Sequence, residues 1–578
     1  MPNPASTRRT LPTLALRCSW VWLGLVASTA LAQTPPPPLP NAGSILQQVQ
    51  PSLIPVPPAE QAQPVLKVPR AVAAPASGGG AKVNVKGFRI AGLDAARADR
   101  LQPLLQKYVG PDKSLADLED AAKDVEVALQ RGGLFLAQAY IPEQSLSDSI
   151  VTVQVLEGRI GAVKVEVDPA VKVSGEFLDR IVAILRGNPV AERELIERAL
   201  FTLGDLRGIT VNTSLTPGEK IGQADLDIKI GPGRGAAYTV DLDNGGSLFT
   251  GRVRANVGLD WFNPTGHGDV ASLRGQVSDS LGSEFVRASW LTPINSLGTK
   301  LGVAASFLHY KLGSAIFADL GAHGTAEDYA LQLLHPIVRS RNNNLFVQGT
   351  LDYRRFDDKV DALPLDTRKD VAPYAGVAVV GDFRDTLGGG AISNYSLGVV
   401  TGRLRIKDED DIVVDNENYH AAGRYAKLQL AASRLQLLPT KDYLFLAVSG
   451  QLASKDLDSS EKFSMGGLYG VRGYPSPESP SDSGLIGTWE YRKQIPVEAL
   501  PGDLVVSLFG DYGIARLHQS PLPTDVGNIR RLVSHGIGVT YGGRNGLTVK
   551  GFVAARGGLR AQSDDSRARL YLLVSQQF

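Results

Sequence analysis

The second half of the chain is a succession of short segments in which apolar and polar residues alternate, each followed by a turn. Alternation with a period of two residues is typical of strands that have one apolar and one polar face. An even number of strands with short and long connections is typical of antiparallel barrels in bacterial outer membranes. We therefore predict a transmembrane antiparallel β-barrel of about 16 strands over residues 233–578, with strands that begin near Ala237, Arg252, Asp269, Glu284, Lys300, Ala326, Leu345, Val371, Ile392, Arg424, Tyr443, Leu485, Leu504, Leu532, Leu547 and Arg567.

The phase of the alternation assigns side chains to the two faces of the barrel wall. From Leu504 to Tyr512 the even-numbered residues are mostly apolar and are expected to face lipid, which directs Ser507 and Asp511 into the lumen. The last strand ends at Phe578, and this aromatic carboxyl terminus is expected to be the C-terminal signature of the barrel. A soluble β-sandwich would also alternate, but the number of strands favours the membrane.

The amino terminus has the features of a secretory signal peptide. Three arginines precede an apolar run at residues 20–27, and residues 30–32, Ala-Leu-Ala, offer a cleavage site. The apolar run is too short to span a bilayer stably. We assign residues 1–32 to the signal, and because the only cysteine, Cys18, lies within it, the mature chain is expected to contain no thiol.

A leader and a linker rich in proline, alanine and glycine follow the signal. In the leader, residues 33–53, a short helix is predicted over residues 42–50, with Ser44 as a candidate N-cap and Pro51 as the stop. Residues 54–81 are expected to form an extended linker.

Two small α+β modules are predicted between the linker and the barrel. Each has the order strand, helix, helix, strand, strand, first over residues 82–159 and again over residues 160–232. The recurrence of this order indicates two modules of the same type in tandem. The expected helices cover residues 101–108, 115–131, 176–185 and 192–203, and the first strand covers residues 82–90.

Several classes of function are excluded. The formal net charge is +1, which gives no basic surface for nucleic acid. The seven histidines are scattered without ligand spacing, so no metal and no cofactor are predicted. Neither a phosphate-binding P-loop nor a serine nucleophile elbow occurs, and the acidic run at residues 408–411 is expected to be a solvated loop. We predict no catalytic residue and do not expect an enzyme.

A long loop between the eleventh and twelfth predicted strands, residues 457–484, carries an arginine in an unusual setting, Arg472. A guanidinium that leaves bulk water requires a carboxylate partner. The next strand offers Asp511, which is expected to face the lumen. We therefore predict that the loop folds inward and that Arg472 pairs with Asp511. The loop motif also contains Gly470, Val471, Gly473 and Tyr474, and the strand motif also contains Phe509 and Gly513.

These motifs make the chain resemble the transporters of two-partner secretion, the family of haemolysin activators and filamentous-haemagglutinin transporters. The resemblance covers nearly all of the expected mature chain. Residues 140–144 and 153–160 are similar to the end of the family's first POTRA (polypeptide-transport-associated) domain, and residues 243–251 are similar to its first barrel hairpin. The motifs around Arg472 and Asp511 match the family's sixth loop and the strand that receives it.

The resemblance implies a location and a function. Such transporters lie in the outer membrane of Gram-negative bacteria, with their POTRA domains in the periplasm. They bind an unfolded exoprotein, adhesin or haemolysin-like, and pass it through the barrel to the surface without ATP. Outer-membrane lipids and the barrel-assembly machinery are further implied partners. The family also implies a helix lodged in the pore, for which residues 42–50 are in the matching position, with a disordered leader as the alternative. An outer-membrane assembly insertase of the same superfamily is the alternative function.

Overall fold

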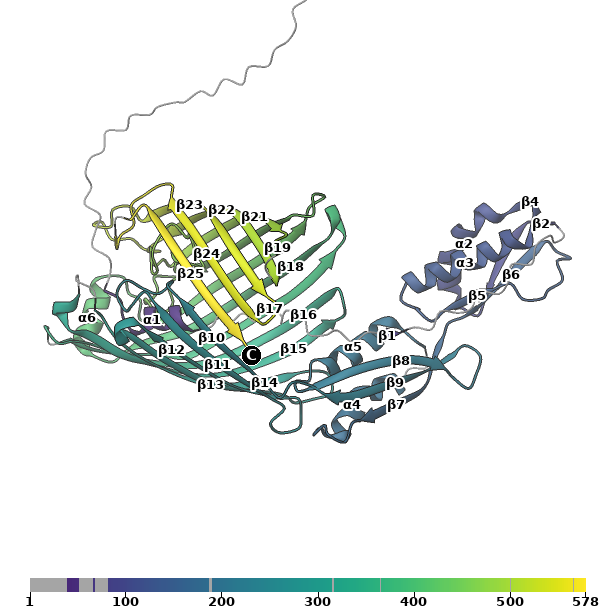
Figure 1. Cartoon of the computed structure of the whole chain (residues 1–578), viewed down its shortest axis with the longest axis horizontal. Coiled ribbons are helices and arrows are strands. Elements are labelled where there is room, and N and C mark those ends of the chain that lie inside the picture. Colours follow the sequence, from purple (N-terminus) through teal and green to yellow (C-terminus); the bar gives the residue numbers. More distant parts are fainter. Residues whose placement is uncertain are drawn as a thin grey trace, which may run out of the picture.

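The structure, a computed structural model of the 578-residue chain, consists of two small modules and a barrel (Figure 1). The predicted signal peptide and most of the predicted linker lie outside the described residues. Within the described part of the chain, no helix is long and apolar enough to cross a membrane. The structure describes residues 39–50, 66–67, 82–186, 190–313, 317–363, 365–498, 501–564 and 566–578.

The first module packs two helices against a sheet in the order β3-β6-β5. The first helix begins earlier than predicted, at Ala95, because Asp94 caps it by accepting the N–H of Arg97 at 2.9 Å. The predicted first strand is interrupted at Lys86, so that β2 pairs with β4 and β3 pairs with β6. The elements are β2 (Val83–Val85), β3 (Gly87–Ala91), α2 (Ala95–Leu105), β4 (Gly110–Lys113), α3 (Leu115–Arg131), β5 (Gln138–Tyr140) and β6 (Ile150–Leu156).

The second module has its own apolar core and a sheet in the order β1-β8-β9-β7. One edge strand of this sheet, β1 (Leu66–Lys67), does not come from the module itself but from the predicted linker between the leader and the first module. This strand pairs with β8 in parallel, with residue 66 opposite Thr213 and residue 67 opposite Ser214. The other elements are β7 (Arg159–Val167), α4 (Gly175–Arg186), α5 (Arg193–Gly204), β8 (Ile209–Pro217) and β9 (Gln223–Pro232).

The remaining strands form a closed barrel in which each strand pairs with the next and β10 pairs antiparallel with β25. The predicted antiparallel barrel of about 16 strands is thereby confirmed. The strands are β10 (Ala236–Asp243), β11 (Arg254–Phe262), β12 (Val270–Ser278), β13 (Ser283–Pro293), β14 (Lys300–Lys311), β15 (Ala322–Arg339), β16 (Asn343–Val360), β17 (Leu365–Asp385), β18 (Ala391–Ile406), β19 (Gly423–Leu437), β20 (Tyr443–Ala453), β21 (Ser483–Ile495), β22 (Gly502–Arg516), β23 (Ile529–Gly543), β24 (Leu547–Arg556) and β25 (Ala568–Gln577).

Side-chain exposure separates the two faces of the barrel wall. In β22, Leu508 and Tyr512 are 51% and 48% exposed, whereas Ser507 and Asp511 are 7% and 3% exposed. The apolar side chains that are exposed on the barrel form the surface that lipid covers in a membrane. The inward residues are packed against the contents of the lumen, so the faces follow the predicted phase.

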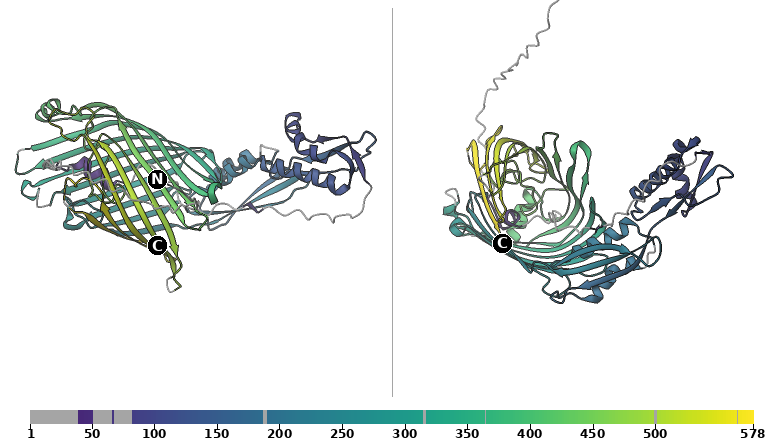
Figure 2. Two further views of the ribbon diagram at one scale, coloured as in Figure 1. Left: turned by 90° about the horizontal axis from the view of Figure 1, so that it is seen from above. Right: turned by 45° about the vertical axis from the view of Figure 1, so that its right-hand side comes forward.

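A short helix, α1 (Ala42–Val49), lies inside the ring of strands and is visible in purple in both views of Figure 2. It packs against β14, β15 and β16, and its residues Ala42, Ile45 and Leu46 are almost fully buried. The N–H of Ala42 donates to Oδ1 of Asp358 in β16 at 2.7 Å, and Nε2 of Gln50 donates to Oδ2 of Asp328 in β15 at 2.5 Å. The helix is therefore fixed to one side of the barrel interior.

Two local expectations are corrected. The N-cap of α1 is Asn41, and Ser44 takes the third helical position of a capping box, because each side chain accepts the backbone N–H of the other. The acidic run after β18 is not an irregular loop but the start of a helix, α6 (Glu409–Glu417). Carboxylates in the first turn of a helix are favoured because they face the free N–H groups and the positive end of its dipole.

Candidate functional site: a loop and a helix inside the barrel

The connection between β20 and β21, residues 454–482, which we name L6, turns back into the barrel. An isolated antiparallel bridge between Phe463 and Ser481 brings its two ends together, and an isolated parallel bridge joins Gly466 to Val471 nearer its tip. Val471 and Tyr474 near its tip are fully buried. Most of L6 is therefore packed inside the barrel, although Tyr469 near the tip is 84% exposed.

Arg472 at the tip of L6 is held by two carboxylates of the barrel wall. Its Nε and Nη2 lie 3.0 and 2.8 Å from the two oxygens of Asp511 in β22, and its Nη1 lies 3.1 Å from Glu490 in β21. Its backbone N–H also donates to Asp511, at 3.1 Å. The guanidinium lies over the ring of Phe509, 3.4 Å from the centroid. The Arg472 side chain is 8% exposed and that of Asp511 is 0% exposed, so the pair is shielded from water.

The other residues of the two motifs surround this ion pair. The hydroxyl of Tyr474 donates to the carbonyl of Leu559 in the loop after β24 at 2.9 Å. A Cβ added to Gly473 would lie 2.8 Å from the Cβ of Ser534, so the approach of L6 to the wall requires glycine there. Among the remaining motif residues, Gly470 lies against the carbonyl of Met465, Gly513 lies against Met465 and Val471, and Phe578 lies apart at the barrel end, where its backbone pairs with Tyr238.

Further ion pairs anchor L6, and sequence reasoning did not find them. Glu461 of L6 lies 2.8 Å from Nη1 of Arg354 in β16 and 2.7 Å from Nζ of Lys427 in β19. Strand phase identifies these two cations as inward-facing, but nothing in the sequence places Glu461 opposite them. Two other pairs join Asp458 to Lys369 of β17 at 3.0 Å and Glu478 to Arg530 of β23 at 3.1 Å. L6 is thus tied to several sides of the barrel.

Helix α1 and L6 are in direct contact. Nε2 of Gln47 donates to the backbone carbonyl of Ser460, and the hydroxyl of Ser459 donates to Oδ1 of Asn41 at 2.7 Å. A Cβ added to Gly43 would lie 2.4 Å from the Cβ of Ser460, so the helix approaches L6 as closely as a glycine permits. The two segments form one packed unit inside the barrel.

The second module is attached to the barrel at the end opposite L6. Asp205 at the end of α5 accepts Nε and Nη2 of Arg339 in β15 at 2.9 and 2.5 Å. Burial alone would raise the pKa of the Asp205 carboxyl, but Arg339, together with Lys300 and Arg207, outweighs burial and lowers this pKa below its usual value. Arg339 also lies over the ring of Phe201, 5.0 Å from its centroid.

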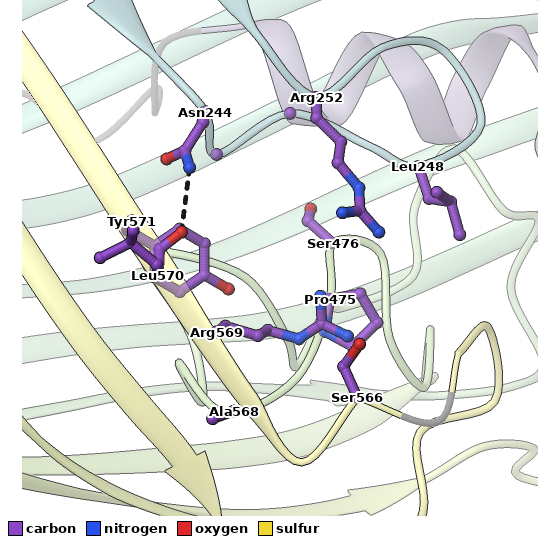
Figure 3. Close-up of a pocket in the computed structure, with 12 residues that line it drawn as sticks. Asn244, Leu248, Arg252, Pro475, Ser476, Ser566, Ala568, Arg569, Leu570 and Tyr571 are labelled. Atoms are coloured by element: carbon purple, nitrogen blue, oxygen red, sulfur yellow. Dashed lines mark hydrogen bonds between the residues drawn. The ribbon is translucent and has the colours of Figure 1, made fainter.

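The seam between β10 and β25 is continued by a side chain. Beyond the last backbone pair, Asn244 donates Nδ2–H to the carbonyl of Leu570 at 2.9 Å and accepts the N–H of Leu572 at 2.7 Å. Figure 3 shows this bond beside a pocket into which Arg252 and Arg569 extend from the two sides of the seam. The motif that was expected to form the first barrel hairpin lies in the turn between β10 and β11, and through Asn244 it also joins the first strand of the barrel to the last.

Sequence models of known families match most of the chain. The model described as haemolysin secretion/activation protein ShlB/FhaC/HecB matches residues 222–541, more than half of the chain. The model described as POTRA domain, ShlB-type, matches residues 83–158.

Individual relatives and solved structures agree with these matches. The heme/hemopexin transporter protein HuxB of Haemophilus influenzae (strain 86-028NP) is 28% identical over 446 residues, which cover 77% of this chain and 78% of the relative. The outer membrane transporter CdiB of Escherichia coli O6:K15:H31 (strain 536 / UPEC) is 22% identical over 277 residues, which cover 46% and 45%. Among solved structures, CdiB from Escherichia coli has a TM-score of 0.67 at 18% identity, over 88% of this chain and 93% of that one. CdiB from Acinetobacter baumannii has a TM-score of 0.60 at 17% identity, over 89% and 95%.

The structural neighbours establish a common fold, a POTRA-bearing outer-membrane barrel. The family match confirms the predicted resemblance, function and location, and favours a secretion transporter over an assembly insertase. The chain belongs to the haemolysin secretion/activation family ShlB/FhaC/HecB and is an outer-membrane transporter of two-partner secretion.

Proposed function

We propose that this transporter captures one unfolded exoprotein, adhesin or haemolysin-like, on its periplasmic modules and passes it through the barrel to the cell surface. HuxB is described as a heme/hemopexin transporter, so a heme- or hemopexin-related exoprotein is the first cargo to test. We propose residues 1–32 as a removed signal, 33–53 as a leader with the plug helix, 54–81 as a linker, 82–159 and 160–232 as POTRA 1 and POTRA 2, and 233–578 as the barrel.

The observation that carries the capture step is the pairing of β1 with β8. An extended segment of this same chain, residues 66–67, already adds to the edge of the POTRA 2 sheet. Strand addition uses backbone hydrogen bonds, so an edge of this kind accepts extended peptides of many sequences. The exoprotein would take this edge in place of the chain's own segment.

The passage step requires the lumen to open. Helix α1 and L6 fill part of the barrel interior and contact each other, so both are expected to move before an extended chain enters. The bidentate pair of Arg472 and Asp511 is proposed as the lock that returns L6 to one defined position. No catalytic step is part of this proposal, because the folding of the exoprotein outside the cell can drive its transport.

The edge proposal is tested by holding β1 in place. The only native cysteine is Cys18 in the proposed signal, so cysteines introduced by Lys67→Cys and Ser214→Cys can be joined by a short bifunctional thiol reagent without a competing thiol. Cross-linking of the double variant is expected to reduce export strongly, whereas the same reagent leaves export by either single variant unchanged. Undiminished export after complete cross-linking would show that this edge is not used.

A deletion tests the requirement for POTRA 1. Removal of residues 82–158 is expected to abolish export while the barrel still inserts, because barrel closure involves none of those residues. Barrel insertion is checked by heat-dependent migration in gels. Normal export by an inserted deletion variant would overturn the proposed role of POTRA 1.

A further inference from the structure

Two loops at the outer end of the barrel bring together a histidine and two aspartates. Asp456 and Asp482 lie at the two ends of L6, and His518 lies in the connection between β22 and β23, residues 517–528, which we name L7. One ligand atom from each of the three residues lies within 4.8 Å of the other two. Asp456 and Asp482 are 2% and 0% exposed, so both carboxylates are buried.

The two oxygens of the Asp456 carboxylate differ in their hydrogen bonding. Its Oδ2 accepts the N–H of Ser520 at 2.9 Å. Its Oδ1 is buried and has no hydrogen-bond partner among the residues that the structure describes. Nδ1 of His518 lies 3.5 Å from this oxygen and is itself buried without a hydrogen-bond partner in the described part of the chain. Leaving buried polar atoms unsatisfied is costly, so a carboxylate oxygen and a ring nitrogen that face each other without partners call for an explanation.

Asp482 has one further lone pair to offer. Its Oδ1 accepts both Nζ of Lys462 at 2.7 Å and the N–H of Leu457 at 3.0 Å, which uses both lone pairs of that oxygen. Among the residues with described positions, its Oδ2 accepts one hydrogen bond, from the N–H of Gln519 at 2.9 Å. Lys462 balances one of the two carboxylates, so the cluster keeps a net charge of about −1 with a neutral imidazole.

The ring of His518 is held in its orientation by stacking. The ring of Tyr419 lies parallel to it, with centroids 3.8 Å apart and an interplanar angle of 4°. The hydroxyl of Tyr419 is in turn fixed by donation to Asp525 at 2.9 Å. Nδ1 of His518 is therefore presented to the two carboxylates by a preorganised ring.

We propose that Asp456, Asp482 and His518 bind one divalent first-row transition ion, best represented by Zn²⁺, which joins L6 to L7. Imidazole together with carboxylate oxygens suits such ions, whereas Ca²⁺ and Mg²⁺ take oxygen ligands. The ligand atoms would be Oδ1 of Asp456, Oδ2 of Asp482 through its remaining lone pair, and Nδ1 of His518, and a water molecule would complete a tetrahedron. Sequence spacing predicted no metal, because Asp456 and Asp482 stand at opposite ends of L6 and His518 comes from another connection, L7.

Zinc binding by the full-length protein tests this site. The protein is purified in detergent with an affinity tag that contains no histidine, stripped with a chelator, and titrated with Zn²⁺ against a chromophoric chelator. We expect one ion per chain and no displacement by a hundredfold excess of Ca²⁺. His518→Ala and the nearly isosteric Asp456→Asn should each weaken binding at least about tenfold.

A matched variant controls for adventitious binding. His309 lies 3.4 Å from Glu284, a histidine–carboxylate pair for which no third ligand lies nearby among the described residues, so His309→Ala should bind zinc like the wild type. Heat-dependent gel migration confirms that each barrel is folded. The proposal is overturned if the wild type binds no stoichiometric zinc, if Ca²⁺ displaces it, or if folded His518→Ala and Asp456→Asn bind zinc as tightly as the wild type.

Discussion

The ion pair between Arg472 and Asp511 combines one bidentate contact, made of two hydrogen bonds, with a position of the guanidinium over the ring of Phe509. Lysine has one compact ammonium group, which cannot form both contacts or stack in the same way. We expect Arg472→Ala and Asp511→Asn to impair export strongly, and Arg472→Lys to restore only part of it. Export of the exoprotein is measured beside barrel insertion, and wild-type export by correctly inserted Arg472→Ala would refute the lock.

The effect of reversing the charges of Arg472 and Asp511 depends on Glu490, the second carboxylate that contacts Arg472. Arg472 also contacts Glu490 at 3.1 Å, so the double change Arg472→Asp with Asp511→Arg would place an aspartate beside Glu490. Like charges in a shielded site repel, and therefore the reversed pair is expected not to restore export. Adding Glu490→Gln to the reversed pair should recover part of it. Full recovery by the double variant alone would mean that Glu490 has no role.

Glu461 provides a separate test of how L6 is anchored. Glu461→Gln leaves Arg354 and Lys427 as shielded cations with fewer carboxylate partners, and loss of one member of a buried ion pair typically costs about 3–5 kcal/mol. We expect L6 to become sensitive to protease in intact cells. Glu498→Gln, at an exposed position in the turn after β21, is the control and should leave L6 resistant. Equal resistance of the two variants would show that Glu461 does not anchor L6.

The residues that sequence alone could identify are those in which a local motif and strand phase coincide. Arg472 stands in a recognisable loop motif, and the alternation in β22 directs Asp511 inward, so their pairing was predictable. Glu461 and His518 lack such a motif, since their partners are defined only by the path of a long loop across the lumen. Periodicity gives the face of a strand, but it does not give the fold of a loop.

At the scale of elements, α1 is stabilised by its surroundings more than by its own sequence. The helix has eight residues, and isolated helices of this length are marginal in water. Its capping box and its buried face explain why it forms inside the barrel. The sequence placed this helix correctly but could not decide whether it occupies the lumen, because that depends on contacts with L6 and the wall.

Gly43 allows helix propensity to be separated from docking. Gly43→Ala favours an isolated helix by about 1 kcal/mol, yet the new methyl group would lie 2.4 Å from the Cβ of Ser460. We therefore expect Gly43→Ala to loosen α1 and to raise single-channel conductance in planar bilayers. Combining it with Ser460→Gly, which removes the opposing Cβ, should lower the conductance only part of the way back, because Cα of residue 460 would still lie 2.9 Å from the new methyl group. Gln48→Ala serves as the control, because the Gln48 side chain donates to the carbonyl of Ser44 within the helix.

At the scale of the whole molecule, the transporter must hold its periplasmic modules in a fixed position relative to the pore. The order of modules and barrel was predictable from periodicity, whereas the junction was not. Asp205 and Arg339 are distant in sequence, and nothing in the sequence distinguishes either of them from an exposed charged residue. Their contact arises because POTRA 2 packs beside the periplasmic end of β15.

The pH dependence of this junction follows from Asp205. Its pKa is lowered in the folded protein, so the stabilisation from its charge is fully present above its unfolded pKa of about 3.9 and is lost as the pH falls through the lower, folded value. The junction should therefore be unchanged between neutral pH and about pH 5 and loosen only in stronger acid. Spin labels on POTRA 2 and on the turn after β15 report this as a broadened distance distribution. Asp205→Asn keeps the size of the side chain but removes the charge, so it should broaden the distribution at neutral pH and abolish the acid transition. An acid transition that persists unchanged in Asp205→Asn would assign it to another group.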